Sequence, residues 1–204
     1  MRTYVKVIGE LLKDEYVAVQ GTNEYSDKKI LLREEKLKDY RVYVNVEGYA
    51  IRLIKLDVET SEDVDQKCTY DLFAQSINMN DYLIVFEDER NVYYLLIELK
   101  SRSASGAIQQ LRNGYCLCKL IHEVATSHKE KKVTTKKTPQ YVGIIFRETT
   151  AKNAERKERL YLKPNESDEL ILDSFSVYTY ERPYKSFPFP AFLTHFPKDK
   201  AQSV

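Results

Sequence analysis

The sequence predicts an α/β domain with a mixed central sheet flanked by helices. Two apolar segments of strand length, 82–86 (YLIVF) and 92–99 (VYYLLIEL), are followed by a long amphipathic segment and then by a further apolar run, 141–146 (YVGIIF). The order strand, strand, helix, strand indicates an α/β domain, and the polar segment between the first two strands makes them a hairpin. With 43% apolar residues among 204, the chain can bury a core of this kind.

The N-terminal part is expected to add a helix and more strands. Residues 1–20 fit either a helix, with the stripe Val5, Ile8, Leu12 and Tyr16, or two short strands at 3–8 and 16–20, and we favour the helix. Residues 30–38 (ILLREEKLK) also look helical. Segments 41–46 and 50–58 have the pattern of strands, with a Glu47-Gly48 turn between them, and 59–67 is an acidic connector.

The clearest helix of the chain follows the predicted hairpin. Residues 87–91 (EDERN) supply the hairpin's polar loop, and 103–106 (SASG) offer N-cap chemistry for the helix. Apolar residues then recur every three or four positions, as in a helix packed on a sheet. This stripe consists of Ile108, Leu111, Tyr115, Cys118, Ile121 and Val124.

The C-terminal part begins after a lysine-rich loop at 127–139. Residues 151–163 are expected to form a basic helix or hairpin, and 170–179 a strand. The segment 183–197 is too rich in proline for a helix and too apolar for a free linker, so we expect it to wrap the domain or dock on a partner. We expect three parts: 1–66, the N-terminal part of the same domain; 67–163, the core; and 164–204, the C-terminal strand and tail.

Charge is balanced overall but not along the chain. Lys and Arg number 32 against 31 Asp and Glu, yet residues 41–98 carry 5 basic and 12 acidic side chains, whereas residues 99–163 carry 15 basic and 5 acidic ones. The second segment suits contacts with phosphate, and its lysine runs include Lys131, Lys132, Lys136 and Lys137.

Several classes of protein are excluded by composition. No apolar run approaches the roughly 20 residues that span a bilayer, so a membrane protein is not expected. Three cysteines (Cys68, Cys116 and Cys118) do not make a disulfide framework, which favours a cytoplasmic location. The sequence also contains no phosphate-binding glycine loop and no serine-hydrolase motif.

The residues with the most chemical content lie at the ends of the predicted hairpin strands. Glu98 and Lys100 point to the same face of their strand because strand side chains alternate. Counting back through the hairpin places Asp81 opposite residue 97 or 98, so two carboxylates can converge at one end of the sheet. Two carboxylates and a backbone carbonyl are a typical ligand set for Mg²⁺, with water completing the shell.

This arrangement of Asp81, Glu98-Leu99-Lys100 and 107–111 (AIQQL) resembles the PD-(D/E)XK nuclease superfamily over residues 68–146. The resemblance implies a restriction-endonuclease-like mixed sheet flanked by helices. It also implies Mg²⁺ or Mn²⁺ bound by Asp81, Glu98 and the carbonyl of Leu99, with Lys100 positioning the attacking water and Gln110 as an auxiliary contact.

The function implied is metal-dependent hydrolysis of phosphodiester bonds, with DNA as the expected substrate, in restriction, antiviral defence or repair. The lysine runs would then grip the nucleic-acid backbone.

Some assignments stay open at this stage. Asp71 is a rival to Asp81 as the first carboxylate, although hairpin counting favours Asp81. The resemblance also implies a further Glu from an upstream helix, which could be Glu10, Glu15, Glu34 or Glu35. The exonuclease branch of the superfamily carries a Gln-x-x-x-Tyr motif, which the spacing from Gln110 to Tyr115 does not fit.

Glu-x-Lys is a short pattern that solvated residues at a strand end also satisfy. The alternative function is therefore a non-catalytic subunit that binds nucleic acid or protein, with the tail as a docking element for a partner or a second copy of the chain.

Overall fold

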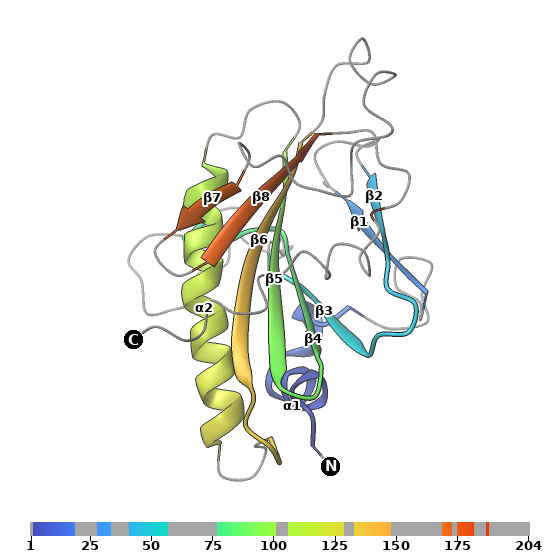
Figure 1. The fold of residues 1–204 in the computed structure, drawn as a ribbon, viewed down its shortest axis with the longest axis vertical. Coiled ribbons are helices and arrows are strands. Elements are labelled where there is room, and N and C mark those ends of the chain that lie inside the picture. Colours follow the sequence, from blue (N-terminus) through green and yellow to red (C-terminus); the bar gives the residue numbers. More distant parts are fainter. Residues whose placement is uncertain are drawn as a thin grey trace.

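The computed structural model describes residues 2–18, 28–33, 41–56, 77–100, 106–128, 133–147, 169–172, 175–181 and 187 (Figure 1). These ranges hold the helices α1 (Tyr4–Leu11) and α2 (Ala107–Ser127) and a short 3-10 helix, η1 (Asp14–Tyr16). They also hold the strands β1 (Lys29–Arg33), β2 (Arg41–Asn45), β3 (Ile51–Lys55), β4 (Tyr82–Glu87), β5 (Asn91–Lys100), β6 (Thr138–Arg147), β7 (Glu169–Leu172) and β8 (Phe175–Glu181). No helix within these ranges has both the length and the apolar character needed to cross a membrane.

The main sheet is mixed, which confirms the predicted class. Its strand order is β3-β4-β5-β6-β8-β7. The pairs β3/β4, β4/β5 and β7/β8 are antiparallel, whereas β5/β6 and β6/β8 are parallel. Between β5 and β6 the chain passes through α2, as a parallel connection requires. Strands from the N-terminal and C-terminal parts of the chain thus complete the sheet of the core.

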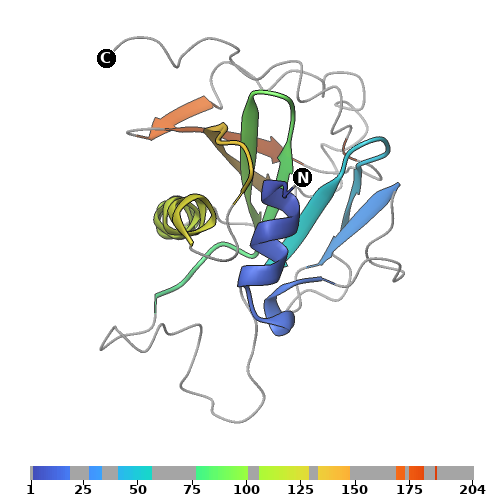
Figure 2. The same ribbon diagram turned by 90° about the horizontal axis from the view of Figure 1, so that it is seen from below.

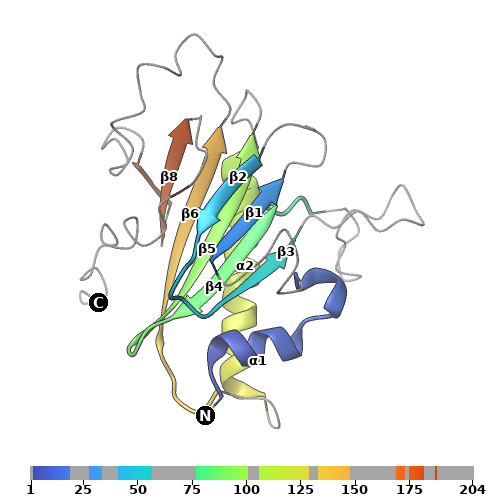
Figure 3. The ribbon, with the colours of Figure 1, turned by 90° about the vertical axis from the view of Figure 1, so that its right-hand side faces the viewer.

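The domain has three layers, with the main sheet in the middle. The helices α1 and α2 lie on one face of this sheet, and the two-stranded sheet β1-β2 lies on the other (Figures 2 and 3). Alternate residues of β5 divide between two buried clusters, Leu96 on the helix side and Leu95 and Ile97 on the side of β1-β2. Both faces of β5 are therefore covered, which explains its nearly continuous apolar sequence.

The prediction of a helix at 30–38 is wrong where the structure describes it. Residues 29–33 form β1, which pairs antiparallel with β2 through contacts such as Leu31 with Tyr43. Ile30, Leu31 and Leu32 are all buried. Three consecutive buried apolar residues suit a covered strand, and pairing with β2 outweighs the helix-forming composition of this segment. Residues 34–38 lie outside the described ranges.

The remaining N-terminal predictions agree with the structure in type. The favoured helix is confirmed over Tyr4–Leu11, so the alternative strand at 3–8 is wrong. Tyr16 of the predicted stripe lies in η1 instead, and Val17 forms only an isolated bridge with Ile54 of β3. The predicted strands at 41–46 and 50–58 correspond to β2 and β3. Gly48 lies in the turn between them with φ 86°, a left-handed conformation that glycine adopts without strain. After this turn the chain moves from one sheet to the other.

The predicted amphipathic helix corresponds to α2, with two differences. Leu111, Cys118 and Ile121 are buried as expected, but Val124 is exposed, and Ala125 and His122 face the core in its place. The N-cap residue is Gly106 at φ 79°, and no side chain caps the helix. The serines that were expected to cap it, 103 and 105, lie outside the described ranges.

The C-terminal segment 170–179 forms two strands, β7 and β8, rather than one. In the tail, Phe187 is buried and pairs in parallel with Val44 of β2. Its N–H donates to Tyr43 O at 2.5 Å, and its carbonyl accepts from Asn45 N at 3.1 Å. The tail therefore docks on its own domain at this residue. The basic segment predicted at 151–163 is outside the described residues.

Candidate active site

The end of the β4-β5 hairpin brings the predicted carboxylates to one face of the sheet. Tyr82 pairs with Ile97, so Asp81 and Glu98 occupy the next opposed positions. By the alternation of strand side chains, Asp81 shares a face with Leu83, and Glu98 with Leu96. Both leucines pack in the cluster on the helix side. The face that carries the two carboxylates is therefore the one that α2 covers.

Asp81 joins three strands at their ends. Its Oδ2 accepts a hydrogen bond from Leu99 N at 2.6 Å, and its carbonyl accepts one from Leu56 N, just after β3, at 2.9 Å. A strand residue directs its N–H and C=O to the same side. The Leu99 carbonyl therefore lies on the side of Asp81, where the resemblance places a third oxygen ligand.

Glu98, Lys100 and Gln110 form a connected chain of polar contacts. Glu98 is only 1% exposed, and its Oε1 lies 2.5 Å from Lys100 Nζ. Lys100 Nζ also donates to Gln110 Oε1 at 2.7 Å. A buried carboxylate is costly unless it is paired, and Lys100 supplies that partner.

Gln110 links the chain of contacts back to the strand side. It lies in the first turn of α2, and its Nε2 donates to Met79 O at 3.1 Å. The prediction that this residue lies early in a helix next to Lys100 is therefore confirmed. Lys100 is fixed between a carboxylate on its own strand and an amide on the helix.

The donor set of this site fits a hard divalent cation in kind. Asp81, Glu98 and the Leu99 carbonyl offer the oxygen ligands that Mg²⁺ and Mn²⁺ accept. Among the described residues, no three His, Cys, Asp or Glu side chains gather in one group that could hold a metal. A bound ion would therefore depend on the backbone carbonyl and water as well as on the two carboxylates.

The alternative carboxylates are not brought into the site by the described contacts. Glu10 is exposed on α1, and Glu15 forms an exposed ion pair with Lys13 at 3.9 Å. Asp71, Glu34 and Glu35 lie outside the described residues. Of Asp81 and its rival Asp71, only Asp81 therefore lies in the part of the chain that the structure describes.

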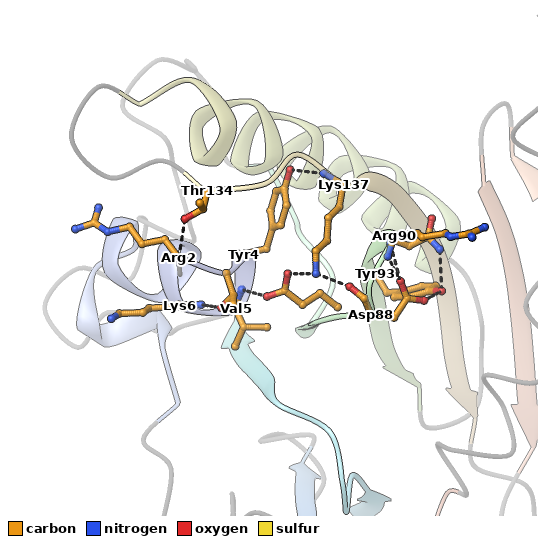
Figure 4. Close-up of polar contacts among 12 residues, drawn as sticks. Arg2, Tyr4, Val5, Lys6, Asp88, Arg90, Tyr93, Thr134 and Lys137 are labelled. Atoms are coloured by element: carbon orange, nitrogen blue, oxygen red, sulfur yellow. Dashed lines mark hydrogen bonds and ion pairs between the residues drawn. The ribbon is translucent and has the colours of Figure 1, made fainter.

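Lys137 has a structural environment of its own. Its Nζ lies 2.7 Å from Glu87 Oε2 and donates to Asp88 O, and both side chains of the ion pair are 9% exposed. Its backbone N–H donates to Tyr4 OH at 3.2 Å, so it also anchors α1 (Figure 4). This packing accounts for Lys137 without a phosphate. Lys136 is exposed, and Lys131 and Lys132 lie outside the described residues.

Lys136 and Lys137 lie at the opposite end of the sheet from Glu98 and Lys100. In the parallel β5/β6 pair, Thr138 aligns with Asn91, whereas Arg147 aligns with Lys100. At 3.3 Å per residue, the ten-residue strands separate these ends by about 30 Å. Lys136 therefore lies too far away to contact the same phosphate as Lys100.

Two residues that the sequence analysis did not select belong to the candidate site. Arg147 ends β6 at the register position beside Lys100, and it adds a second basic residue to this edge. Asn80, fully buried, donates through Nδ2 to Tyr82 O at 2.7 Å and to Ile97 O at 3.3 Å. Arg147 is identified only by the parallel pairing of β6 with β5, which places it beside Lys100, and no local sequence motif marks it.

Buried histidine and cysteine side chains on α2 serve packing. His122 stacks on Tyr4 with ring centroids 5.1 Å apart, and its Nδ1 lies 3.1 Å from Tyr94 OH. Burial lowers the pKa of His122, which Glu123 partly opposes, and burial raises the pKa of the Cys118 thiol. Both side chains therefore help to pack α2 against the sheet.

No protein-family model, curated protein or solved structure matches this chain. The functional conclusion therefore depends on the geometry of the site and on the resemblance of its motif.

Proposed function

We propose that the protein is a metal-dependent nuclease of the PD-(D/E)XK type that hydrolyses phosphodiester bonds, with DNA as the first substrate to test. The observation that carries this proposal is the convergence of Asp81, Glu98, Lys100 and Gln110 at one end of the β4-β5 hairpin. Three side chains of this set are joined by two contacts of 2.5 and 2.7 Å. Residues separated by up to 29 positions are thus gathered in one place.

The order of the surrounding elements supports the restriction-endonuclease-like part of the proposal. Asp81 immediately precedes β4, and the other motif residues lie on β5 and α2; the helix then leads to a parallel strand, β6, that is buried in the sheet. This is the strand, strand, helix, strand order that accompanied the motif in the sequence. The site lies at the carboxyl ends of the parallel strands β5 and β6, where mixed α/β sheets commonly bind ligands.

Each residue has a defined role in the proposed reaction. Asp81, Glu98 and the Leu99 carbonyl would hold Mg²⁺ or Mn²⁺. The chemistry that such an ion supplies when bound is polarisation of the phosphate and a lower pKa of water. Lys100 places a positive charge beside the attacking water and the developing negative charge, and Gln110 fixes the direction of its Nζ. Arg147 is suited to hold a neighbouring phosphate.

The ion pair of Glu98 and Lys100 also favours a second candidate. A carboxylate and an ammonium 2.5 Å apart neutralise one another, so the same contacts can serve as a structural tie in a non-catalytic binding subunit. The two functions differ in metal binding and in cleavage.

The test is incubation of the full chain with plasmid, linear and single-stranded DNA and with RNA, in Mg²⁺, Mn²⁺ or EDTA. We expect cleavage of at least one substrate with a metal and none with EDTA. Glu98→Gln keeps the shape of the side chain but removes a charged ligand, so it should abolish cleavage. Glu47→Gln, which alters an exposed turn carboxylate, should leave cleavage unchanged. Absence of wild-type cleavage on every substrate would favour the binding subunit.

A role in DNA restriction, antiviral defence or repair inside the cell is the biological setting that the resemblance suggests. A DNA-damage or phage-challenge phenotype of a deletion strain would test it.

A further inference from the structure

A buried amide lies directly beside the proposed ligand Asp81. Asn80 is fully buried, and its Nδ2 donates to the carbonyls of Tyr82 and Ile97. These two residues are the final pair of the β4/β5 ladder before Asp81 and Glu98. One side chain therefore bridges the two strands at the last residue pair before the two carboxylates.

The oxygen of this amide, Asn80 Oδ1, faces α2 at a glycine, where the helix has no side chain. Gly114 lies one helical turn after Gln110, and a Cβ at this position would overlap Asn80 Oδ1 and lie 3.0 Å from its Cγ. The same Cβ would be 2.8 Å from Leu96 Cδ2. Only glycine lets α2 approach the hairpin this closely. Within the described part of the chain, Asn80 Oδ1 is buried and accepts no hydrogen bond.

The segment before β4 is held to α2 at successive residues. Asn113 Nδ2 donates to Asn78 O at 2.8 Å, and Gln110 Nε2 donates to Met79 O at 3.1 Å. Asn80 follows against Gly114. The segment ends in Asp81, whose position is thus set by its contacts with both the helix and the strand.

A buried amide with an acceptor left unmatched is costly, and an apolar residue would fill the same space at lower cost. An apolar residue would, however, lack the Asn80 Nδ2 donor that bridges Tyr82 O and Ile97 O at the end of the hairpin. We propose that Asn80, with Gly114 as its partner on α2, is a positioning residue that sets Asp81 relative to Glu98 and so determines metal affinity. This inference rests on the proposed nuclease function, since it assigns a purpose to the spacing of the two ligands.

Mn²⁺ binding by the full-length protein, measured by calorimetry without nucleic acid, tests this inference. Asn80→Ser removes the amide that joins Tyr82 O and Ile97 O. Asn113→Ser is the matched control, because it removes an amide contact to the same segment from the more exposed side. We expect Asn80→Ser to weaken Mn²⁺ binding by about 10-fold to 100-fold, the range for residues that support metal ligands, and Asn113→Ser to change it by less than about threefold.

Gly114→Ala tests the same positioning role from the helix, because its Cβ would press on the Asn80 side chain. It should also weaken Mn²⁺ binding. In the double variant Asn80→Ser/Gly114→Ala, the smaller serine makes room for the new methyl group. Thermal stability should therefore recover relative to Gly114→Ala, while Mn²⁺ affinity stays low. A merely structural role would restore both together.

The outcomes separate this inference from the proposed function. If the wild-type protein binds no Mn²⁺, the proposed metal site is wrong, and the inference falls with it. If the wild-type protein binds Mn²⁺ and folded Asn80→Ser or Gly114→Ala binds it equally well, Asn80 is not a positioning residue, and the metal site stands.

Discussion

At the scale of single residues, the candidate site is built from side chains that replace backbone contacts where the β4/β5 ladder ends. Asp81 Oδ2 accepts from Leu99 N, and Asn80 Nδ2 donates to Ile97 O. The strand end is thus closed by polar side chains rather than by a further residue pair. These contacts hold the candidate site residues at a fixed edge of the sheet rather than on a flexible loop.

The buried His122 provides a prediction on pH dependence. Burial lowers its pKa below the ordinary value of 6.5, so below that value the unfolded chain binds more protons than the folded protein does. The free energy of unfolding should therefore fall as the pH decreases through 6.5 towards the lower folded-state pKa. Urea unfolding of wild type and His122→Gln between pH 7.5 and 5 should show a shallower decrease for the variant.

His128→Gln on the same helix is the comparison for that measurement. His128 follows the last turn of α2 and is only half-buried. Equal changes in pH slope for the two variants would contradict the role assigned to burial of His122.

At the scale of elements, the hairpin loop and the start of β6 are joined by one ion pair. Lys137 and Glu87 are nearly buried, and Val5 N of α1 lies 3.5 Å from Glu87 Oε1. Three elements thus meet at these two side chains, about 30 Å from the candidate site by strand length. The contact holds α1 against the hairpin.

The adjacent lysines 136 and 137 give a matched pair of substitutions at this point. Lys137→Ala leaves the Glu87 carboxylate buried without its partner, so we expect a loss of about 3 kcal/mol in the free energy of unfolding. Lys136→Ala removes an exposed side chain and should change it by less than about 0.5 kcal/mol. Chemical denaturation of both variants checks the difference, and similar values for the two would contradict it.

The helices and strands differ in how well local sequence predicts them. Segments with one dominant pattern, such as β4, β5, β6 and α2, were correctly predicted in type. The segment of β1 was predicted wrongly because Leu, Lys and Glu favour helices locally, whereas its pairing partner β2 is a tertiary contact. Asp81 and Glu98 could be placed on one face because a hairpin fixes its own register. Arg147 and Gly114 could not be assigned roles, because their neighbours come from other elements.

At the scale of the whole molecule, the C-terminal tail joins the two sheets. Phe187 pairs with β2 and packs edge-to-face on Phe146 of β6 and Tyr180 of β8, with ring centroids 5.2 and 5.1 Å apart. One aromatic residue thus contacts both the second sheet and the main sheet. The tail is part of the core at this residue.

Phe187→Ala should accordingly destabilise the entire domain. Loss of a buried phenylalanine costs about 3–5 kcal/mol, and the change should also increase cleavage of the tail by protease. Leu120→Ala, at a 56% exposed position on α2, should cost less than about 1 kcal/mol. Thermal unfolding together with limited proteolysis measures both effects. A Phe187→Ala protein as stable as Leu120→Ala would show that the tail adds nothing to the core.

The proposed function depends most directly on Lys100. The deciding measurement is single-turnover cleavage at saturating DNA and excess Mg²⁺, comparing wild type, Lys100→Ala and Lys136→Ala, with circular dichroism to verify folding. Because Lys100 supports the buried Glu98, Lys100→Gln is included as a variant that keeps a hydrogen-bond donor. We predict that both Lys100 variants cleave slower by on the order of 10² or more with nearly unchanged DNA affinity, and that Lys136→Ala cleaves like wild type. Equal cleavage rates for wild type and folded Lys100 variants would contradict the assignment of this site as a nuclease centre.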